Sequence, residues 1–192
     1  MERKAEIKRE TKETDITLCL NLEGGPAKLE TGVGFLDHML ASFSIHSGFG
    51  LEVKAEGDLR VDSHHTVEDI GIVLGMAFKQ ALGDKLGIER FSSAYIPMDE
   101  ALAFAAVDIS GRAYLKFDAE FPQQAIGNFD ACLAEEFFRA FAFNAGITLH
   151  IRSEYGSNSH HICEAIFKAC ARALKEAVRV TGSSVSSSKG VL

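Results

Sequence analysis

The stretch "DSHHTVEDIG" at residues 62–71 is nearly repeated as "NSHHICEAIF" at residues 158–167, half of the 192-residue chain later. Upstream of these motifs, "GLEVKAEGDLRV" at 50–61 aligns without a gap with "GITLHIRSEYGS" at 146–157, and both segments begin as a short alternating strand. A repeat that keeps its register over this length indicates an internal duplication.

The duplication extends further towards the start of each half. "LDHMLASF" at 36–43 pairs with "AEEFFRAF" at 134–141 after an adjustment of two residues, which sets His38 opposite Glu136. "ETDITLCLNL" from residue 13 resembles "DEALAFAAVDI" from residue 99, and both alternate as strands do. Each half therefore reads as strands, a helix, a strand and a second helix.

This order of elements predicts an α+β protein, because the strands come in runs and not in strict alternation with helices. We expect an internally duplicated two-layer fold with two pseudo-symmetric halves, each with a sheet and two helices. The first half spans residues 1–90 and the second 91–180, and residues 181–192 form a C-terminal tail.

Both motifs are predicted to begin a helix. Ser63 and Ser159 are expected N-caps, whose hydroxyls would accept hydrogen bonds from otherwise unpaired backbone N–H groups. Apolar residues recur at helical spacing after each motif and predict a core-facing side. The histidines themselves then lie in the first turn, where solvent and substrate reach them.

On a helix, residues four positions apart project from nearly the same face. His64 and Glu68 can therefore bind one cation together, and so can His160 and Glu164. A single His-His pair is more often a surface or helix-start feature than a metal site. Core packing has no need for the same histidines and glutamate twice, so the duplication favours metal binding.

The second histidine of each motif, His65 or His161, points away from the first and can serve a second cation. With His38 and Glu136 from the preceding helices, the chain offers eight donors, or four for each of two metals. Four protein donors leave an octahedral ion with open positions, which is typical of a catalytic site.

Composition narrows the class of protein. The formal net charge of −7 argues against a nucleic-acid partner, which normally requires a basic face. No apolar run reaches membrane-spanning length, so we expect no membrane association. The four cysteines are scattered, which suits reduced thiols and a cytoplasmic location. An anionic substrate would need a metal or local arginines to reverse the negative electrostatic potential of the protein at its site.

Seven segments resemble the imidazoleglycerol-phosphate dehydratase family of histidine biosynthesis, in order and over essentially the whole chain: "GFLDHML", "DSHHTVEDIGI", "MDEAL", "SGRAYL", "GITLHI", "NSHHICEAIFKA" and "SSSKGVL". The resemblance implies a duplicated fold like the second domain of ribosomal protein S5. It also implies a homo-oligomer of 24 subunits, with two manganese ions (Mn²⁺) per active site and sites at subunit interfaces.

Carried over by position, the resemblance assigns the metal ligands His38, His64, His65, Glu68, His160, His161 and Glu164. Glu136 stands where many members have histidine. A carboxylate is also a good manganese ligand, so the site is expected to survive with one more negative charge near the metal, and direct coordination by Glu136 is left open. Of these residues, His65, Glu68, His161 and Glu164 are also expected to take part in catalysis.

The resemblance also assigns the substrate contacts Glu13, His38, Arg90, Arg112, Ser187 and Lys189. Composition alone favours a flexible terminus for the serine-rich tail and surface roles for the arginines. The resemblance favours a phosphate site instead, because hydroxyls, backbone N–H groups and a lysine are suitable phosphate ligands.

The implied reaction turns imidazoleglycerol phosphate into imidazole acetol phosphate and water. A metal on each ring nitrogen would favour the imidazolate, whose electrons expel the neighbouring hydroxyl to give a diazafulvene-like intermediate. A carboxylate then removes the adjacent carbon-bound proton, and Glu13 is the candidate.

Two other functions are considered. A dinuclear metallohydrolase would cleave a phosphoester with metal-bound hydroxide, although such sites are normally richer in aspartate. A non-enzymatic protein could use the metals only to join subunits, and its ions would be coordinatively closed.

Overall fold

The computed structural model describes residues 3–190. The first half of the chain forms β1 (Lys4–Glu10), β2 (Thr14–Asn21), β3 (Ala27–Glu30), α1 (Gly34–Ser47), β4 (Gly50–Gly57) and α2 (His64–Leu82). The second half forms β5 (Phe91–Met98), β6 (Ala101–Asp108), β7 (Tyr114–Asp118), β8 (Ala125–Ile126), β9 (Phe129–Asp130), α3 (Leu133–Ala145), β10 (Thr148–Tyr155) and α4 (Ser159–Ala177).

The two four-stranded sheets have the same topology. The first has the order β1-β2-β4-β3 and the second the order β5-β6-β10-β7. In each, the outer hairpin and the next strand pair antiparallel, and the last pair, β3 with β4 or β7 with β10, is parallel. The small β8–β9 hairpin belongs to the second half and has no counterpart among the described residues of the first. The predicted duplicated α+β fold, with a sheet and two helices in each half, is confirmed.

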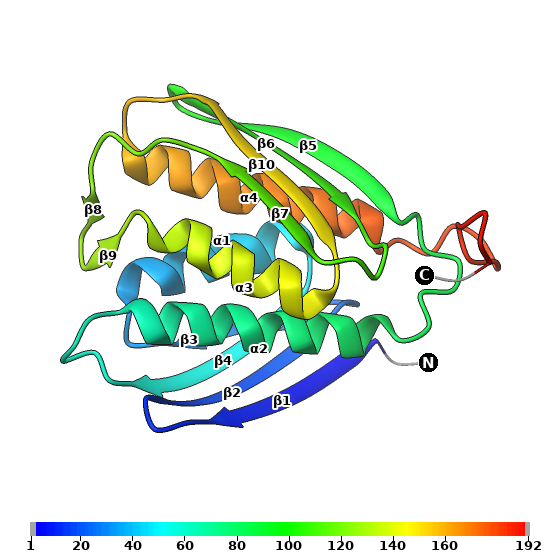
Figure 1. Ribbon diagram of the computed structural model, residues 1–192, viewed down its shortest axis with the longest axis horizontal. Coiled ribbons are helices and arrows are strands. Elements are labelled where there is room, and N and C mark those ends of the chain that lie inside the picture. Colours follow the sequence, from blue (N-terminus) through cyan, green and yellow to red (C-terminus); the bar gives the residue numbers. More distant parts are fainter. Residues whose placement is uncertain (1–2, 191–192) are drawn as a thin grey trace.

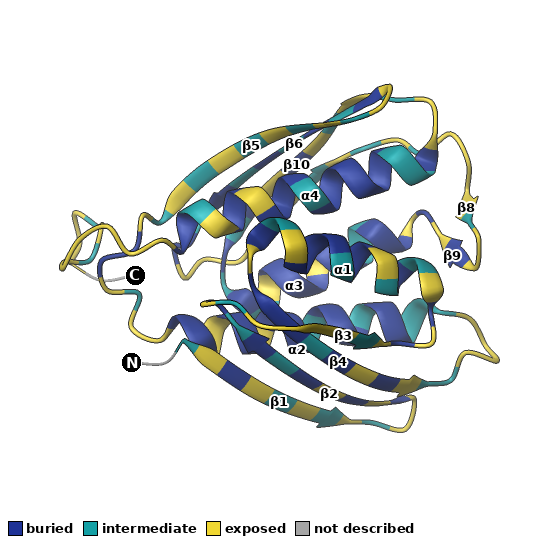
Figure 2. Cartoon of the chain, turned by 180° about the vertical axis from the view of Figure 1, so that it is seen from behind, coloured by how far each residue is buried: buried dark blue, intermediate teal, exposed yellow. Residues whose placement is uncertain are grey.

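The four helices lie between the two sheets, which form the outer layers (Figure 1). Strand alternation decides which side of each sheet meets the helices: Ile16, Leu18 and Leu20 of β2 are buried, and the residues between them face outwards. The same striping of buried and exposed positions runs along the outer strands in Figure 2. Each half is thus a two-layer unit whose helices cover its own sheet.

The helices pack across the two halves. Helix α1 contacts α4, and α2 contacts α3. The approach of α2 to α3 depends on glycine, because a Cβ added at Gly71 would lie 2.6 Å from the carbonyl oxygen of Phe137. At Gly75 it would lie 2.6 Å from the carbonyl oxygen of Phe141. These contacts advance along both helices together, so α2 and α3 run in the same direction.

The predicted N-cap position of Ser63 is confirmed and that of Ser159 is wrong, and neither serine hydroxyl caps its helix. Asp62 Oδ1 accepts from the backbone N–H of His64 at 2.8 Å, and Asn158 Oδ1 accepts from that of His160 at 2.9 Å. Ser63 precedes α2 without a capping side-chain bond. Ser159 is already helical, and its hydroxyl exchanges two hydrogen bonds with the backbone of Gln123. That tertiary contact competes with capping for the hydroxyl.

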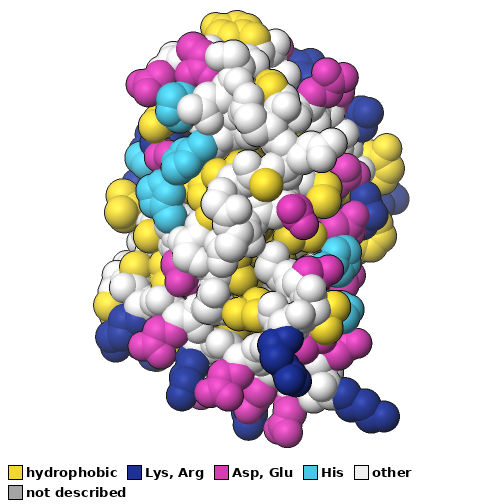
Figure 3. All heavy atoms as spheres, turned by 90° about the vertical axis from the view of Figure 1, so that its left-hand side faces the viewer, with side chains coloured by type: hydrophobic (Ala, Val, Ile, Leu, Met, Phe, Trp, Pro, Cys, Tyr) yellow, Lys and Arg dark blue, Asp and Glu magenta, His cyan; other side chains and the backbone are white. Residues whose placement is uncertain are grey.

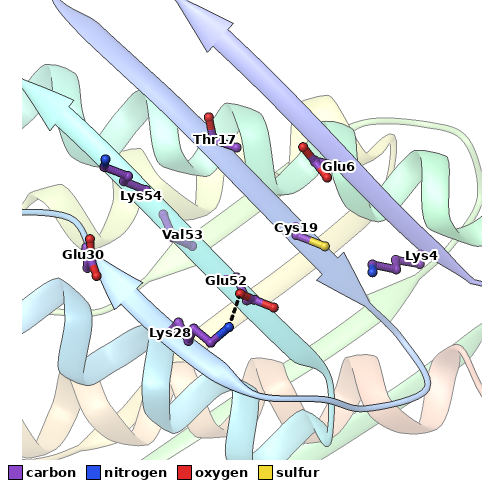
Figure 4. Close-up of a pocket in the computed structure, with 9 residues that line it drawn as sticks. All are labelled: Lys4, Glu6, Thr17, Cys19, Lys28, Glu30, Glu52, Val53 and Lys54. Carbon is purple, nitrogen blue, oxygen red and sulfur yellow. Dashed lines mark hydrogen bonds and ion pairs between the residues drawn. The ribbon is translucent and has the colours of Figure 1, made fainter.

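The outer face of the first sheet is charged. An open hollow of about 410 Å³ lies there, and its lining residues, drawn in Figure 4, are Lys4, Glu6, Thr17, Cys19, Lys28, Glu30, Glu52, Val53 and Lys54. Lys28 Nζ lies 2.8 Å from Glu52 Oε2 within it. The hollow contains none of the motif residues. Within residues 3–190, no helix combines the length and the apolar character needed to cross a membrane.

Candidate metal centre

His38, His160 and Glu164 bring three donor atoms within 4.8 Å of one another. His38 Nε2 lies 3.5 Å, and His160 Nε2 3.3 Å, from Glu164 Oε2. Among the described residues, this is the one group of three His, Cys, Asp or Glu side chains so arranged. Because His38 belongs to α1 and the other two belong to α4, the group forms only where the two halves of the chain meet.

Neighbouring side chains hold this group in place. The Phe35 ring packs 5.1 Å from that of His160 and 6.4 Å from that of His38, measured between centroids. Glu164 is only 7% exposed, and its other oxygen lies 2.6 Å from Lys168 Nζ. Burial alone would raise the pKa of Glu164, but the Lys168 ammonium and the two histidines outweigh it and lower that pKa. Glu164 therefore stays a carboxylate, the form that binds a cation.

The corresponding residues of the first motif are less converged. His64 Nε2 lies 3.9 Å from Glu68 Oε2, as expected for an i,i+4 pair. Glu136, the counterpart of His38, pairs instead with Arg139, with 3.3 Å between Arg139 Nη1 and Glu136 Oε1. The described part of one chain thus presents three donors at one motif and two at the other.

The second histidine of each motif has a carboxylate on Nδ1. His65 Nδ1 lies 3.0 Å from Asp58 Oδ2, and His161 Nδ1 lies 2.6 Å from Glu100 Oε2. These hydrogen bonds raise the pKa of both histidines. The pKa of Glu100 falls to about 2, mainly through His161 and then through the backbone N–H of Ser157.

Each of these histidines also has an acidic neighbour near Nε2. Glu13 Oε1 lies 3.8 Å from His65 Nε2, and Asp99 Oδ2 lies 3.7 Å from His161 Nε2. Glu13 was predicted from the sequence, whereas Asp58, Asp99, Glu100 and Lys168 were not. The "MDEAL" segment could have indicated Asp99 and Glu100. The two acids stand side by side in the turn before β6, in the same half of the chain as His161.

Seen from the end where α4 begins, histidine side chains gather in two places on the surface, each beside acidic groups (Figure 3). Helices α1 and α4 both start near this end, since the rings of His38 and His160 have centroids 5.6 Å apart.

The predicted substrate residues of the tail region lie at the other end of the molecule (Figure 1). Arg90 donates to both oxygens of Asp108, at 2.7 and 3.3 Å, and to the carbonyl oxygen of Ser186 at 2.6 Å. Arg112 Nη2 lies 3.6 Å from Asp108 Oδ2. Asp108 therefore brings the two arginines together beside the tail.

The tail itself is turned. Its residues 181, 182 and 184 exchange backbone hydrogen bonds with Gly87, and the backbone N–H of Lys189 donates to the Ser187 hydroxyl at 3.2 Å. Residues 191–192 of the predicted tail lie outside the described residues. Within the described residues, neither Arg90 nor the tail up to residue 190 reaches the histidine motifs.

Comparison with known proteins identifies the family. The family model described as imidazoleglycerol-phosphate dehydratase matches residues 31–174. The chain is 58% identical to the imidazoleglycerol-phosphate dehydratase of Acetivibrio thermocellus, with 100% of both chains covered. It is 56% identical to that of Streptococcus gordonii, with 99% of this chain and 100% of the relative covered.

Solved structures agree with these relatives. The crystal structure of imidazoleglycerol-phosphate dehydratase from Staphylococcus aureus superposes with a TM-score of 0.86 at 44% identity, covering 93% of this chain and 99% of that one. The Pyrococcus furiosus structure gives a TM-score of 0.85 at 40% identity, covering 97% and 100%. The chain therefore belongs to the imidazoleglycerol-phosphate dehydratase family and is a dehydratase, that is, a hydro-lyase.

Proposed function

We propose that the chain converts imidazoleglycerol phosphate to imidazole acetol phosphate and water in the cytoplasm, with two manganese ions per active site. The observation that carries this proposal is the group of His38, His160 and Glu164 in a chain of this family. Imidazole nitrogens with a buried, ionised carboxylate suit a divalent transition metal with open coordination positions.

The donors suit two metal ions, one with three donors from this chain and the other with fewer. His38, His160 and Glu164 would hold one ion. His64 and Glu68 would contribute to the second, and His65 and His161 would offer Nε2 to either. Glu136 joins the second ion only if its carboxylate leaves Arg139, and we propose it as the weakest ligand of the set.

We propose that each active site is shared between subunits of a homo-oligomer, of 24 subunits as the family resemblance implies. The support is the separation within one chain between the histidine motifs and the Arg90 and tail region. The side chains of His38 and His160 are 50% and 41% exposed, so their metal-facing side is open to a neighbouring copy.

Bound metals would supply Lewis acidity that favours the deprotonated imidazole ring of the substrate. The hydroxyl next to that ring would leave together with the ring proton as water, which gives a neutral diazafulvene-like species. A carboxylate would then take the proton from the adjacent carbon and return it to the ring. Glu13 is half exposed and lies at the histidine end beside His65, so it is our candidate base. The resulting enol becomes the ketone of the product.

For the phosphate, we propose Arg90, Arg112, Ser187 and Lys189. Arg90 and Arg112 share Asp108, which aligns their guanidinium groups beside the tail. Charge-assisted bonds from such groups are the strong contacts that a phosphate forms. They also supply the local positive field that a protein of net charge −7 needs for an anionic substrate.

An assay for imidazole acetol phosphate tests the proposal. The protein is stripped with a chelator, and manganese is returned in steps. Product should form only with the metal and should saturate as the sites fill. Release of inorganic phosphate without dehydration would instead support a metallohydrolase. Tight metal binding without any turnover would support a non-enzymatic protein in which the metals only join subunits.

A further inference from the structure

Two carboxylates outside the proposed ligand set occupy matching positions on the second histidine of each motif. Asp58 contacts His65 Nδ1, and Glu100 contacts His161 Nδ1. The two acids are not equivalents in the duplication: Asp58 directly follows β4, whereas Glu100 lies in the turn between β5 and β6. The aligned partner of Asp58 is Glu154, which pairs with Arg152. Each half therefore reaches the same contact from a different part of its sheet.

Glu100 is held rigidly for this contact. One of its oxygens, Oε1, accepts from the backbone N–H groups of Ser157 and Asn158, at 3.1 and 2.8 Å, and from the Ser157 hydroxyl at 3.3 Å. Its other oxygen, Oε2, faces His161 Nδ1. The loop that precedes α4 thus fixes the carboxylate, and the carboxylate fixes the ring.

A carboxylate can only accept hydrogen bonds, so it keeps the proton of a neutral imidazole on Nδ1 and leaves the lone pair on Nε2. A hydrogen bond from the ring nitrogen that does not bind the metal commonly orients a metal-binding histidine. On this basis, which rests on the proposed function, we propose that Glu100 and Asp58 are positioning residues that commit Nε2 of His161 and His65 to the metals.

The decisive variant is Glu100→Gln. Its amide oxygen can still accept from Ser157 and Asn158, which leaves the NH₂ group facing His161 Nδ1. An NH₂ donor requires Nδ1 to accept, which moves the proton to Nε2 and removes the metal donor. Glu100→Ala, in contrast, removes the contacts to the loop but allows the His161 ring to adopt either tautomer. A positioning role therefore predicts that the glutamine variant binds metal at least as poorly as the alanine variant. A purely structural role predicts the opposite order.

The experiment measures the dissociation constant of manganese alone on the purified full chain, by titration after metal removal. We expect Glu100→Gln to weaken binding about 10- to 100-fold and its thermal midpoint to stay near that of the parent. Both oxygens of Asp58 face His65 Nδ1, at 3.2 and 3.0 Å, so an asparagine there can turn its amide oxygen to the ring, and Asp58→Asn should weaken binding less than Glu100→Gln. Glu52→Gln, on the charged face of the first sheet, is the matched control and should bind as the parent does.

The outcomes separate the two proposals. Tight binding by the parent with unchanged binding by Glu100→Gln, or clearly weaker binding by Glu100→Ala than by Glu100→Gln, overturns the positioning role alone. A parent protein that binds no manganese overturns the metal-dependent function and this inference together.

Discussion

His38 Nε2 lies 3.5 Å from Glu164 Oε2, although the two residues belong to different halves of a duplicated chain. The contact exists because α1 packs on α4, the second helix of the other half. A metal bound there would link the two halves, so metal binding and correct packing of the halves would be coupled.

Replacing a motif histidine should remove both metal and activity. In His160→Ala, the group around Glu164 loses one of its three donors and leaves a buried carboxylate facing one imidazole. We expect turnover to fall below detection, and metal content after dialysis to drop. His64→Ala should behave likewise at the other site. His150→Ala, on an exposed strand position next to Tyr114, is the control. Full metal occupancy with normal activity in His160→Ala would refute the ligand assignment.

Metal removal should also change the assembly. Because the described donors of one chain do not converge into two complete sites, neighbouring copies are expected to complete them. Chelation should then split the oligomer into smaller species, and added manganese should restore it. Light scattering follows both steps. A particle of constant mass would rule out metal-dependent assembly, although catalysis could still need the metal.

The tail should contribute to substrate binding and not to metal binding. Lys189 lies in the tail beside Ser187, at the end of the molecule remote from the histidine motifs. Loss of one charge-assisted phosphate contact costs roughly 1.5–3 kcal/mol, or about ten- to a hundred-fold in binding. Lys189→Ala should lower kcat/KM by that factor with metal content and assembly unchanged. If this variant and a chain ended at Val185 both match the parent in steady-state kinetics, the phosphate site lies elsewhere.

The close approach of α2 and α3 makes a prediction about stability. In Gly71→Ala, the new methyl group meets the backbone of Phe137 and the Cβ of Ala140, neither of which can move without shifting α3. Overpacking of this kind typically costs about 1–3 kcal/mol. Chemical denaturation should show the loss. Gly34→Ala, where an added Cβ meets nothing within 4 Å, should be neutral, and equal stability of the two variants would show that the helices separate easily.

Local patterns in the sequence determined the duplicated fold. Alternating residues such as Ile16, Leu18 and Leu20 predict a half-buried strand, and the i,i+4 spacing predicts that His160 and Glu164 share a helix face. These features depend on neighbours within a few residues, and the repeat of the motif at half the chain length extends them to both halves. The i,i+4 His-Glu pair within each motif could therefore be predicted from sequence alone.

The tertiary structure alone decided which distant groups meet. His38 faces Glu164 because the helices pair across the halves, Gln123 takes the hydroxyl of Ser159 from its predicted cap, and Glu100 reaches His161 from a hairpin turn. Each contact joins residues far apart in the chain, so it depends on how sheets and helices pack and not on local periodicity. The same packing sets the start of β5 and the tail at the end opposite the start of α4, a separation that no spacing in the sequence encodes.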